Sequence, residues 1–124
     1  MVEIILSALL LTLIQSWLLP MLLNLGNLSF LLSNRDEDFE FSIITKRAKR
    51  ASANLYETLP VFITVMLLGI IFDVDLILLG SIWIALRVIF LMCYLGGIKI
   101  VRSGVWVASV VTLIMMSFNV IAAL

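Results

Sequence analysis

The sequence predicts an all-α integral membrane protein, a bundle of four transmembrane helices. Of its 124 residues, 64% are hydrophobic and 13% are charged, which is far too apolar for a soluble domain. A helix needs about 20 apolar residues to cross a hydrocarbon core of roughly 30 Å, and the chain holds four apolar blocks. We therefore expect one membrane domain over residues 1–124, with spans at about 4–24, 47–72, 76–95 and 105–124.

The first span follows the N-terminus directly. It opens with Glu3 and lacks both the basic segment and the small-residue cleavage site of a signal peptide, so we expect a retained helix. Pro20 lies near its end. Because proline has no N–H and its ring clashes with the preceding turn, Pro20 should bend or locally loosen this helix.

The second span combines a short apolar block with the polar stretch "RASANLYET" before it. Extended back through that stretch, the helix carries Arg50, Asn54 and Glu57, spaced four and three residues apart. At 100° per residue these three side chains fall within about 60° of one another. Glu57 lies about 10 Å deeper than Arg50. A carboxylate facing lipid there would be costly, so we expect Glu57 to face the protein interior or a wet cavity.

The third span is interrupted by a basic residue. Arg87 lies within "GSIWIALRVIFLMCY", seven residues before Tyr94 and on the same helix face. Counted inward from Tyr94, its depth matches that of Glu57. The sequence therefore predicts an ion pair between Arg87 and Glu57. Such a pair could also serve only to fix helix packing.

The connections between the spans set the topology. Every lysine and arginine except Arg87 lies in or beside the first and third connections, the latter being "GGIKIVRSG" before the fourth span. The opposite side carries only Glu3, Asp73 and Asp75. By the positive-inside rule the basic connections are cytoplasmic, and both termini lie on the non-cytoplasmic side.

A polar set gathers at the predicted cytoplasmic end. Arginine side chains bind carboxylates and a carboxylate binds an ammonium group, so this set can hold a small zwitterionic ligand. Its members are Arg50, Asn54, Glu57, Tyr94, Arg102 and Ser103. The chain has no histidine and one cysteine, Cys93, which argues against Ser-His-Asp and Cys-His catalysis and against a metal site. We expect no nucleic-acid partner.

Two motifs carry a family resemblance. "RASANLYETLP" resembles the second-helix signature of the MAPEG superfamily, the membrane-associated proteins in eicosanoid and glutathione metabolism. "RVIFLMCYLGGIKIVRSGVW" is similar to that family's third helix and following loop, and the pattern is closest to the uncharacterised bacterial branch. The resemblance implies a homotrimer in a bacterial inner membrane, with glutathione bound between neighbouring subunits near the cytoplasmic face.

The same resemblance implies roles for single residues. Five would bind glutathione, namely Arg50, Asn54, Glu57, Tyr94 and Ser103. Arg102 would be catalytic and lie beside the sulfur. A guanidinium there favours the nucleophilic thiolate, because it lowers the thiol pKa by stabilising the charged form.

The leading hypothesis is a glutathione-dependent membrane enzyme of transferase or peroxidase type. Glutathione would be the co-substrate, and the second substrate would be a lipophilic electrophile that arrives through the lipid bilayer. One alternative is a small four-helix transporter that uses Glu57 as a proton or cation site. Another is a non-catalytic protein that keeps the MAPEG fold. A trimer favours the enzyme and a dimer the transporter.

Overall fold

The computed structural model describes residues 1–124 and confirms the all-α class, since it contains helices and no strand. Four helical segments are long and apolar enough to cross a membrane, namely Val2–Leu23, Ile43–Ile71, Ile77–Gly96 and Lys99–Ala122. They have 22, 29, 20 and 24 residues. The expectation of four spans therefore holds, with boundaries that differ at the basic ends of two helices.

The first segment is not a regular α-helix throughout. It consists of α1 (Val2–Leu13), a π-helical turn η1 (Ile14–Leu18) and α2 (Leu19–Leu23). Pro20 lies just after the π-helical turn and lacks the N–H that an α-helix would use there. The Ser52 hydroxyl donates to the Gln15 carbonyl in this turn at 2.9 Å. The expected loosening near Pro20 thus takes the form of a π-helical turn tied to the second span.

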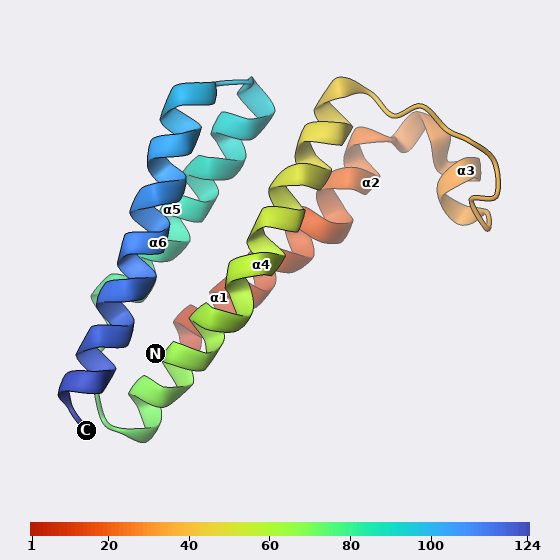
Figure 1. The fold of residues 1–124 in the computed structure, drawn as a ribbon. Coiled ribbons are helices and arrows are strands. Elements are labelled where there is room, and N and C mark those ends of the chain that lie inside the picture. Colours follow the sequence, from red (N-terminus) through yellow and green to blue (C-terminus); the bar gives the residue numbers. More distant parts are fainter.

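A short hook follows the first segment. It contains a 3₁₀ turn η2 (Leu25–Asn27) and α3 (Leu28–Leu32), and it leads into a loop that returns to the bundle (Figure 1). Stacked and edge-on rings of Phe30, Phe39 and Phe41 hold the loop, with centroids 4.5 to 6.0 Å apart. The Asn24 amide donates to the Pro20 carbonyl at 2.7 Å and to Thr45 Oγ1 at 3.3 Å, which fixes the hook to the next helix.

The second span, α4 (Ile43–Ile71), begins four residues earlier than expected. Ser42 is its N-cap, and its hydroxyl oxygen accepts a hydrogen bond from the Thr45 N–H at 3.2 Å. Lys46, Arg47 and Lys49 are therefore helical and do not belong to the connection.

The third and fourth spans, α5 (Ile77–Gly96) and α6 (Lys99–Ala122), are joined by a tight turn. Gly97 has φ +73°, in the left-handed region that favours glycine, and it ends α5. Arg47 of α4 donates to the Leu95 carbonyl at 3.4 Å beside this turn. Because α6 begins at Lys99 and not near 105, Arg102 and Ser103 lie on its first turns.

The core joins all four segments around one aromatic pair. The rings of Phe62 and Trp83 stack with centroids 4.0 Å apart, and both side chains are fully buried. The remaining buried members of this cluster are Ala8, Leu11, Leu55, Leu59, Val65, Met66, Leu76, Leu113, Met116 and Val120. The cluster takes residues from α1, α4, α5 and α6, so it joins the four helical segments.

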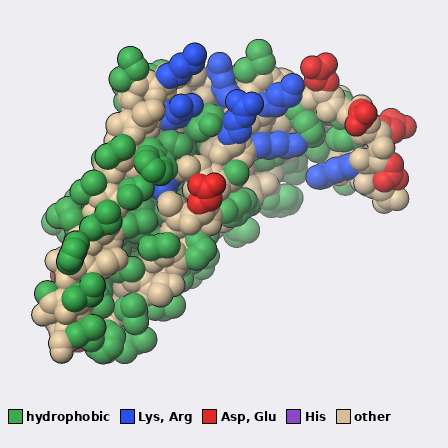
Figure 2. Space-filling view, in the orientation of Figure 1, with side chains coloured by type: hydrophobic (Ala, Val, Ile, Leu, Met, Phe, Trp, Pro, Cys, Tyr) green, Lys and Arg blue, Asp and Glu red, His purple; other side chains and the backbone are tan.

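The helices pair and then diverge. In Figure 1 α1 runs beside α4 and α5 beside α6, and the two pairs separate toward the end that carries α3 and the α5–α6 turn. The chain termini lie toward the opposite end. Figure 2 shows lysine and arginine side chains gathered at the diverging end, with acidic side chains on the adjoining loop. The site described next lies between the diverging pairs.

Candidate functional site

A cleft of about 600 Å³ opens between α4, α5 and α6. All six residues predicted to bind ligand or to act in catalysis line it, together with four more residues from the same helices. The complete lining is Arg50, Ala53, Asn54, Glu57, Phe90, Tyr94, Arg102, Ser103, Trp106 and Val107. The polar set inferred from spacing along separate helices is therefore one site in space.

Helical spacing explains how each wall is built. On α4, Arg50, Asn54 and Glu57 share one face, as their spacing of four and three requires. On α5, Phe90 and Tyr94 are one turn apart, and their rings meet edge to face at 5.4 Å. The third wall comes from the first three turns of α6.

Arg102 is held over an aromatic ring. Its guanidinium carbon lies 4.8 Å from the centroid of the Tyr94 ring, a cation–π contact between α6 and α5. No carboxylate lies within 4.0 Å of its guanidinium nitrogens, so its donors remain available to a ligand. The contact orients a positive charge into the cleft without neutralising it.

The predicted ion pair between Arg87 and Glu57 is not formed. Arg87 is buried, with 1% of its surface exposed, and it donates to Asn54 Oδ1 and to Thr58 Oγ1, each at 2.7 Å. Asn54 and Thr58 are one turn apart and lie on the side of α4 that faces Arg87. Glu57 is rotated by 100° from Thr58, and its exposed side chain lines the cleft. Arg87 therefore meets α4 at the level of Glu57, but rotation about the α4 axis gives it Asn54 and Thr58 as partners.

Arg87 nevertheless has a favourable environment for a buried cation. Its guanidinium carbon lies 5.2 Å from the Trp83 ring centroid and 5.7 Å from that of Phe90. Thr58, which accepts one of its hydrogen bonds, in turn donates to the Leu55 carbonyl at 3.3 Å. Two hydrogen bonds and two aromatic rings take the place of the carboxylate expected from the sequence.

The bond from Arg87 fixes which way the Asn54 amide points. A guanidinium carries only donors, so the amide atom that faces it must be the oxygen. The Asn54 NH₂ group is then turned away from Arg87, on a residue that lines the cleft. Asn54 therefore offers the cleft a hydrogen-bond donor.

The charges of the cleft suit an anionic or zwitterionic ligand. It is lined by two arginines, Arg50 and Arg102, and by one carboxylate, Glu57, and none of these forms an ion pair within the chain. The amide of Asn54 and the hydroxyls of Tyr94 and Ser103 add neutral polar groups. A ligand with more than one acidic group and a single ammonium group would match this set.

The sequence model of the MAPEG family matches residues 4–122. The chain belongs to the MAPEG family. No curated protein and no solved structure matches it. As a MAPEG protein with four apolar helices, it is a multi-pass integral membrane protein of the superfamily that acts in glutathione and eicosanoid metabolism.

Several lining residues of this MAPEG cleft were not assigned to the site from the sequence. Phe90 precedes Tyr94 by one turn, and Trp106 follows Arg102 by one turn. Ala53 and Val107 complete the wall. The helical spacing of three and four residues that identified the polar residues also identifies Phe90 and Trp106. Both were missed because apolar side chains in a membrane helix resemble ordinary packing residues.

Proposed function

We propose that this protein is a glutathione-dependent membrane enzyme of transferase or peroxidase type. The observation that carries the proposal is the meeting of Arg50, Asn54 and Glu57 with Tyr94 and Arg102 in one cleft of a MAPEG protein. The ligand that this cleft best fits is a short zwitterionic peptide with a thiol.

Glutathione matches the cleft group by group. It carries two carboxylates, one ammonium group and two amide carbonyls. Arg50 would bind a carboxylate, and Glu57 would bind the ammonium group. The NH₂ group of Asn54 would donate to a carbonyl or carboxylate oxygen, in keeping with the orientation set by Arg87.

Arg102 would supply the catalytic step. Its guanidinium beside the sulfur would stabilise the thiolate, and the thiol proton would leave to water. In the transferase reaction the thiolate forms a C–S bond to an electrophilic carbon, and the leaving group departs with its electron pair. In the peroxidase reaction two glutathione molecules reduce a hydroperoxide to an alcohol and water and become glutathione disulfide.

A groove next to the cleft supports a lipophilic second substrate. It has a volume of about 330 Å³ and runs between α4 and α6. Thr58 and Val61 continue the α4 wall past Glu57, and Val110 and Ile114 continue the α6 wall past Val107. An apolar electrophile that enters from the bilayer could lie there with its reactive atom toward the thiolate.

Glu57 supports the proposed homotrimer. Its side chain is exposed on the single chain, about 10 Å along α4 from Arg50. A carboxylate that faced lipid at this depth would cost several kcal/mol, so a neighbouring subunit that covers the cleft would complete the site. We further propose that the cleft faces the cytoplasm, that both termini lie on the other side, and that the membrane is a bacterial inner membrane.

Purified protein tests the proposal with a thiol-conjugation assay on a generic aryl halide. Arg102→Ala should lower the rate by about tenfold or more, because each unit of thiol pKa changes the thiolate fraction about tenfold. Lys99→Ala, which removes a cation from the same helix end outside the cleft, should leave the rate unchanged. Equal rates in wild type and Arg102→Ala would remove Arg102 from the mechanism. A trimer without glutathione binding in calorimetry would instead indicate a non-catalytic member of the family.

A further inference from the structure

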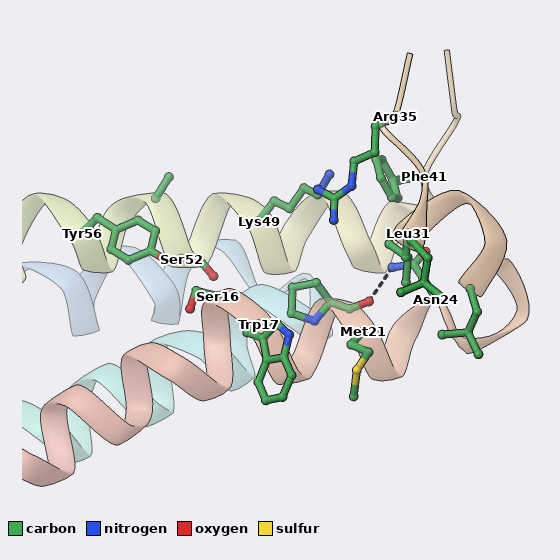
Figure 3. A pocket seen from close by; sticks show the side chains of 14 residues that line it. Ser16, Trp17, Met21, Asn24, Leu31, Arg35, Phe41, Lys49, Ser52 and Tyr56 are labelled. Carbon is green, nitrogen blue, oxygen red and sulfur yellow. Dashed lines mark hydrogen bonds between the residues drawn. The ribbon is translucent and has the colours of Figure 1, made fainter. Parts of the chain in front are cut away.

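A second cavity lies on another face of α4, between the first segment, α3 and α4 (Figure 3). Its volume of about 400 Å³ is in the range of small-molecule pockets. Ala53 is the one residue that it shares with the cleft. Three further α4 residues line it, namely Lys49, Ser52 and Tyr56. Each directly neighbours a cleft residue in the sequence and so points about 100° away from it around the helix axis.

Two basic side chains lie at one end of this cavity. Arg35, from the loop after α3, and Lys49, from α4, point toward one another beside Phe41 (Figure 3). The Lys49 ammonium nitrogen lies 3.4 Å from the centroid of the Phe41 ring, which keeps it at this end.

No carboxylate oxygen lies within 4.0 Å of the side-chain nitrogens of these two cations. Four acidic residues lie close to Arg35 in the same loop, but the one ion pair of the chain joins Glu40 to Lys46 at 3.8 Å. Two like charges that face one another without a counter-ion repel, and an anion between them would remove that repulsion. The end of the cavity is therefore suited to an anionic group.

The rest of the cavity is suited to a hydrocarbon chain. Apolar wall is supplied by Trp17, Met21, Leu28 and Leu31, and Tyr56 lies further along α4, away from the two cations (Figure 3). At 1.5 Å per residue Tyr56 is about 10 Å further along α4 than Lys49. Basic side chains gather at the end of the molecule that carries Lys49 (Figure 2). The lining of the cavity therefore becomes less polar from Lys49 toward the middle of the bundle.

We propose that this cavity binds an anionic phospholipid, with the phosphate between Arg35 and Lys49 and one acyl chain along Trp17 and Met21. A small soluble anion would leave the apolar wall uncovered, and a zwitterionic lipid would bring a like charge to the two cations. The bilayer supplies anionic lipid at high local concentration. The bound lipid would join the α3 hook to α4 and would be separate from the glutathione cleft.

Trp17 provides a reporter inside the cavity. The Trp17 side chain is 67% exposed, whereas that of Trp83 is fully buried. The third tryptophan of the chain, Trp106, lies in the cleft and is removed by Trp106→Phe. The full chain carrying Trp106→Phe is reconstituted in bilayers that contain phosphatidylglycerol or phosphatidylcholine brominated on the acyl chains. Bromine quenches a tryptophan that it contacts, so the ratio of quenching constants reports lipid preference.

We expect phosphatidylglycerol to be preferred by about fivefold for each basic side chain that contacts the phosphate. Arg35→Gln combined with Lys49→Gln should bring the ratio close to one. The matched control is Lys46→Gln combined with Lys99→Gln, which removes the same charge from the same end of the molecule but outside the cavity. That control should keep the preference.

Three results would overturn the proposal. Equal quenching by both lipids before mutation would mean that the cations select no headgroup. An equal loss of preference in the control would assign it to general surface charge. Quenching of Trp17 by neither lipid would mean that another copy of the chain covers the cavity.

Discussion

Replacing Arg87 with methionine tests whether a buried cation prepares the cleft for the proposed binding of glutathione. Methionine keeps a long, flexible side chain but has no donor, so both 2.7 Å hydrogen bonds to Asn54 and Thr58 are lost. The Asn54 amide is then free to turn before glutathione binds. Ordering one such side chain on binding costs about 0.5–1.5 kcal/mol. The Kd for glutathione should therefore rise about two- to tenfold.

A double-mutant cycle separates this role from general packing. Calorimetry in detergent would measure glutathione binding to wild type, Arg87→Met, Asn54→Ala and the double variant, after thermal unfolding has shown that each is folded. Because Asn54→Ala has no amide to orient, adding Arg87→Met to it should change the Kd by less than about twofold. An equal loss in both backgrounds would refute the reasoning. A wild type that does not bind glutathione would instead refute the proposed function.

Three further predictions concern single positions. Asn54→Asp should keep a hydrogen-bond acceptor for Arg87 but present an oxygen to the cleft in place of the NH₂ donor. The affinity for glutathione should therefore fall at least about tenfold, with no loss of thermal stability. Unchanged affinity would contradict the proposed orientation of the amide. Gly97→Ala should destabilise by about 1–2 kcal/mol, because φ is +73° and the added Cβ would lie 2.9 Å from the guanidinium of Arg47. The same change at Gly104, a helical site with open space, should be neutral or stabilising by up to about 1 kcal/mol in the same unfolding assay. Phe62→Ala should cost about 3–5 kcal/mol, since the ring is fully buried against Trp83; a change below about 1 kcal/mol would show that this pair does not organise the core.

The lengths of the apolar blocks were enough to predict four spans, and helical periodicity was enough to predict the face of α4 that lines the cleft. The spacing of Arg50, Asn54 and Glu57 determines a shared direction in any α-helix, whatever the tertiary contacts. Tyr94 and Arg102 reach the same cleft because their helices end and begin at the same end of the bundle. The residues of the cleft could therefore be predicted from helix geometry and from the end of the bundle at which each helix begins or ends.

The partner of Arg87 could not be obtained in the same way. Depth counted from the sequence is good to about one helical turn, and Asn54, Glu57 and Thr58 all lie within one turn. The choice among them depends on how α4 is rotated against α5, and packing around Trp83 and Phe62 determines that rotation.

Helix starts were also missed for a physical reason. An apolar block in the sequence indicates where the hydrocarbon core of the bilayer begins. A helix begins where its first N–H groups find hydrogen-bond acceptors. In α4 that acceptor is the hydroxyl of Ser42, well outside the apolar block. In α6 a basic first turn at Lys99 precedes the apolar residues. The cavity between α3 and α4 was missed because it requires the fold of the hook.

The π-helical turn of the first segment also affects how MAPEG sequences should be aligned. A π-helical turn accommodates one residue more than an α-helical turn over the same rise, so η1 (Ile14–Leu18) acts as a one-residue insertion that leaves the flanking helices in place. Relatives whose first helix is regular should lack one residue within this turn and still match on both sides of it. An alignment without a gap there would shift every position from Leu19 to Asn24 by one and pair core-facing residues with lipid-facing ones.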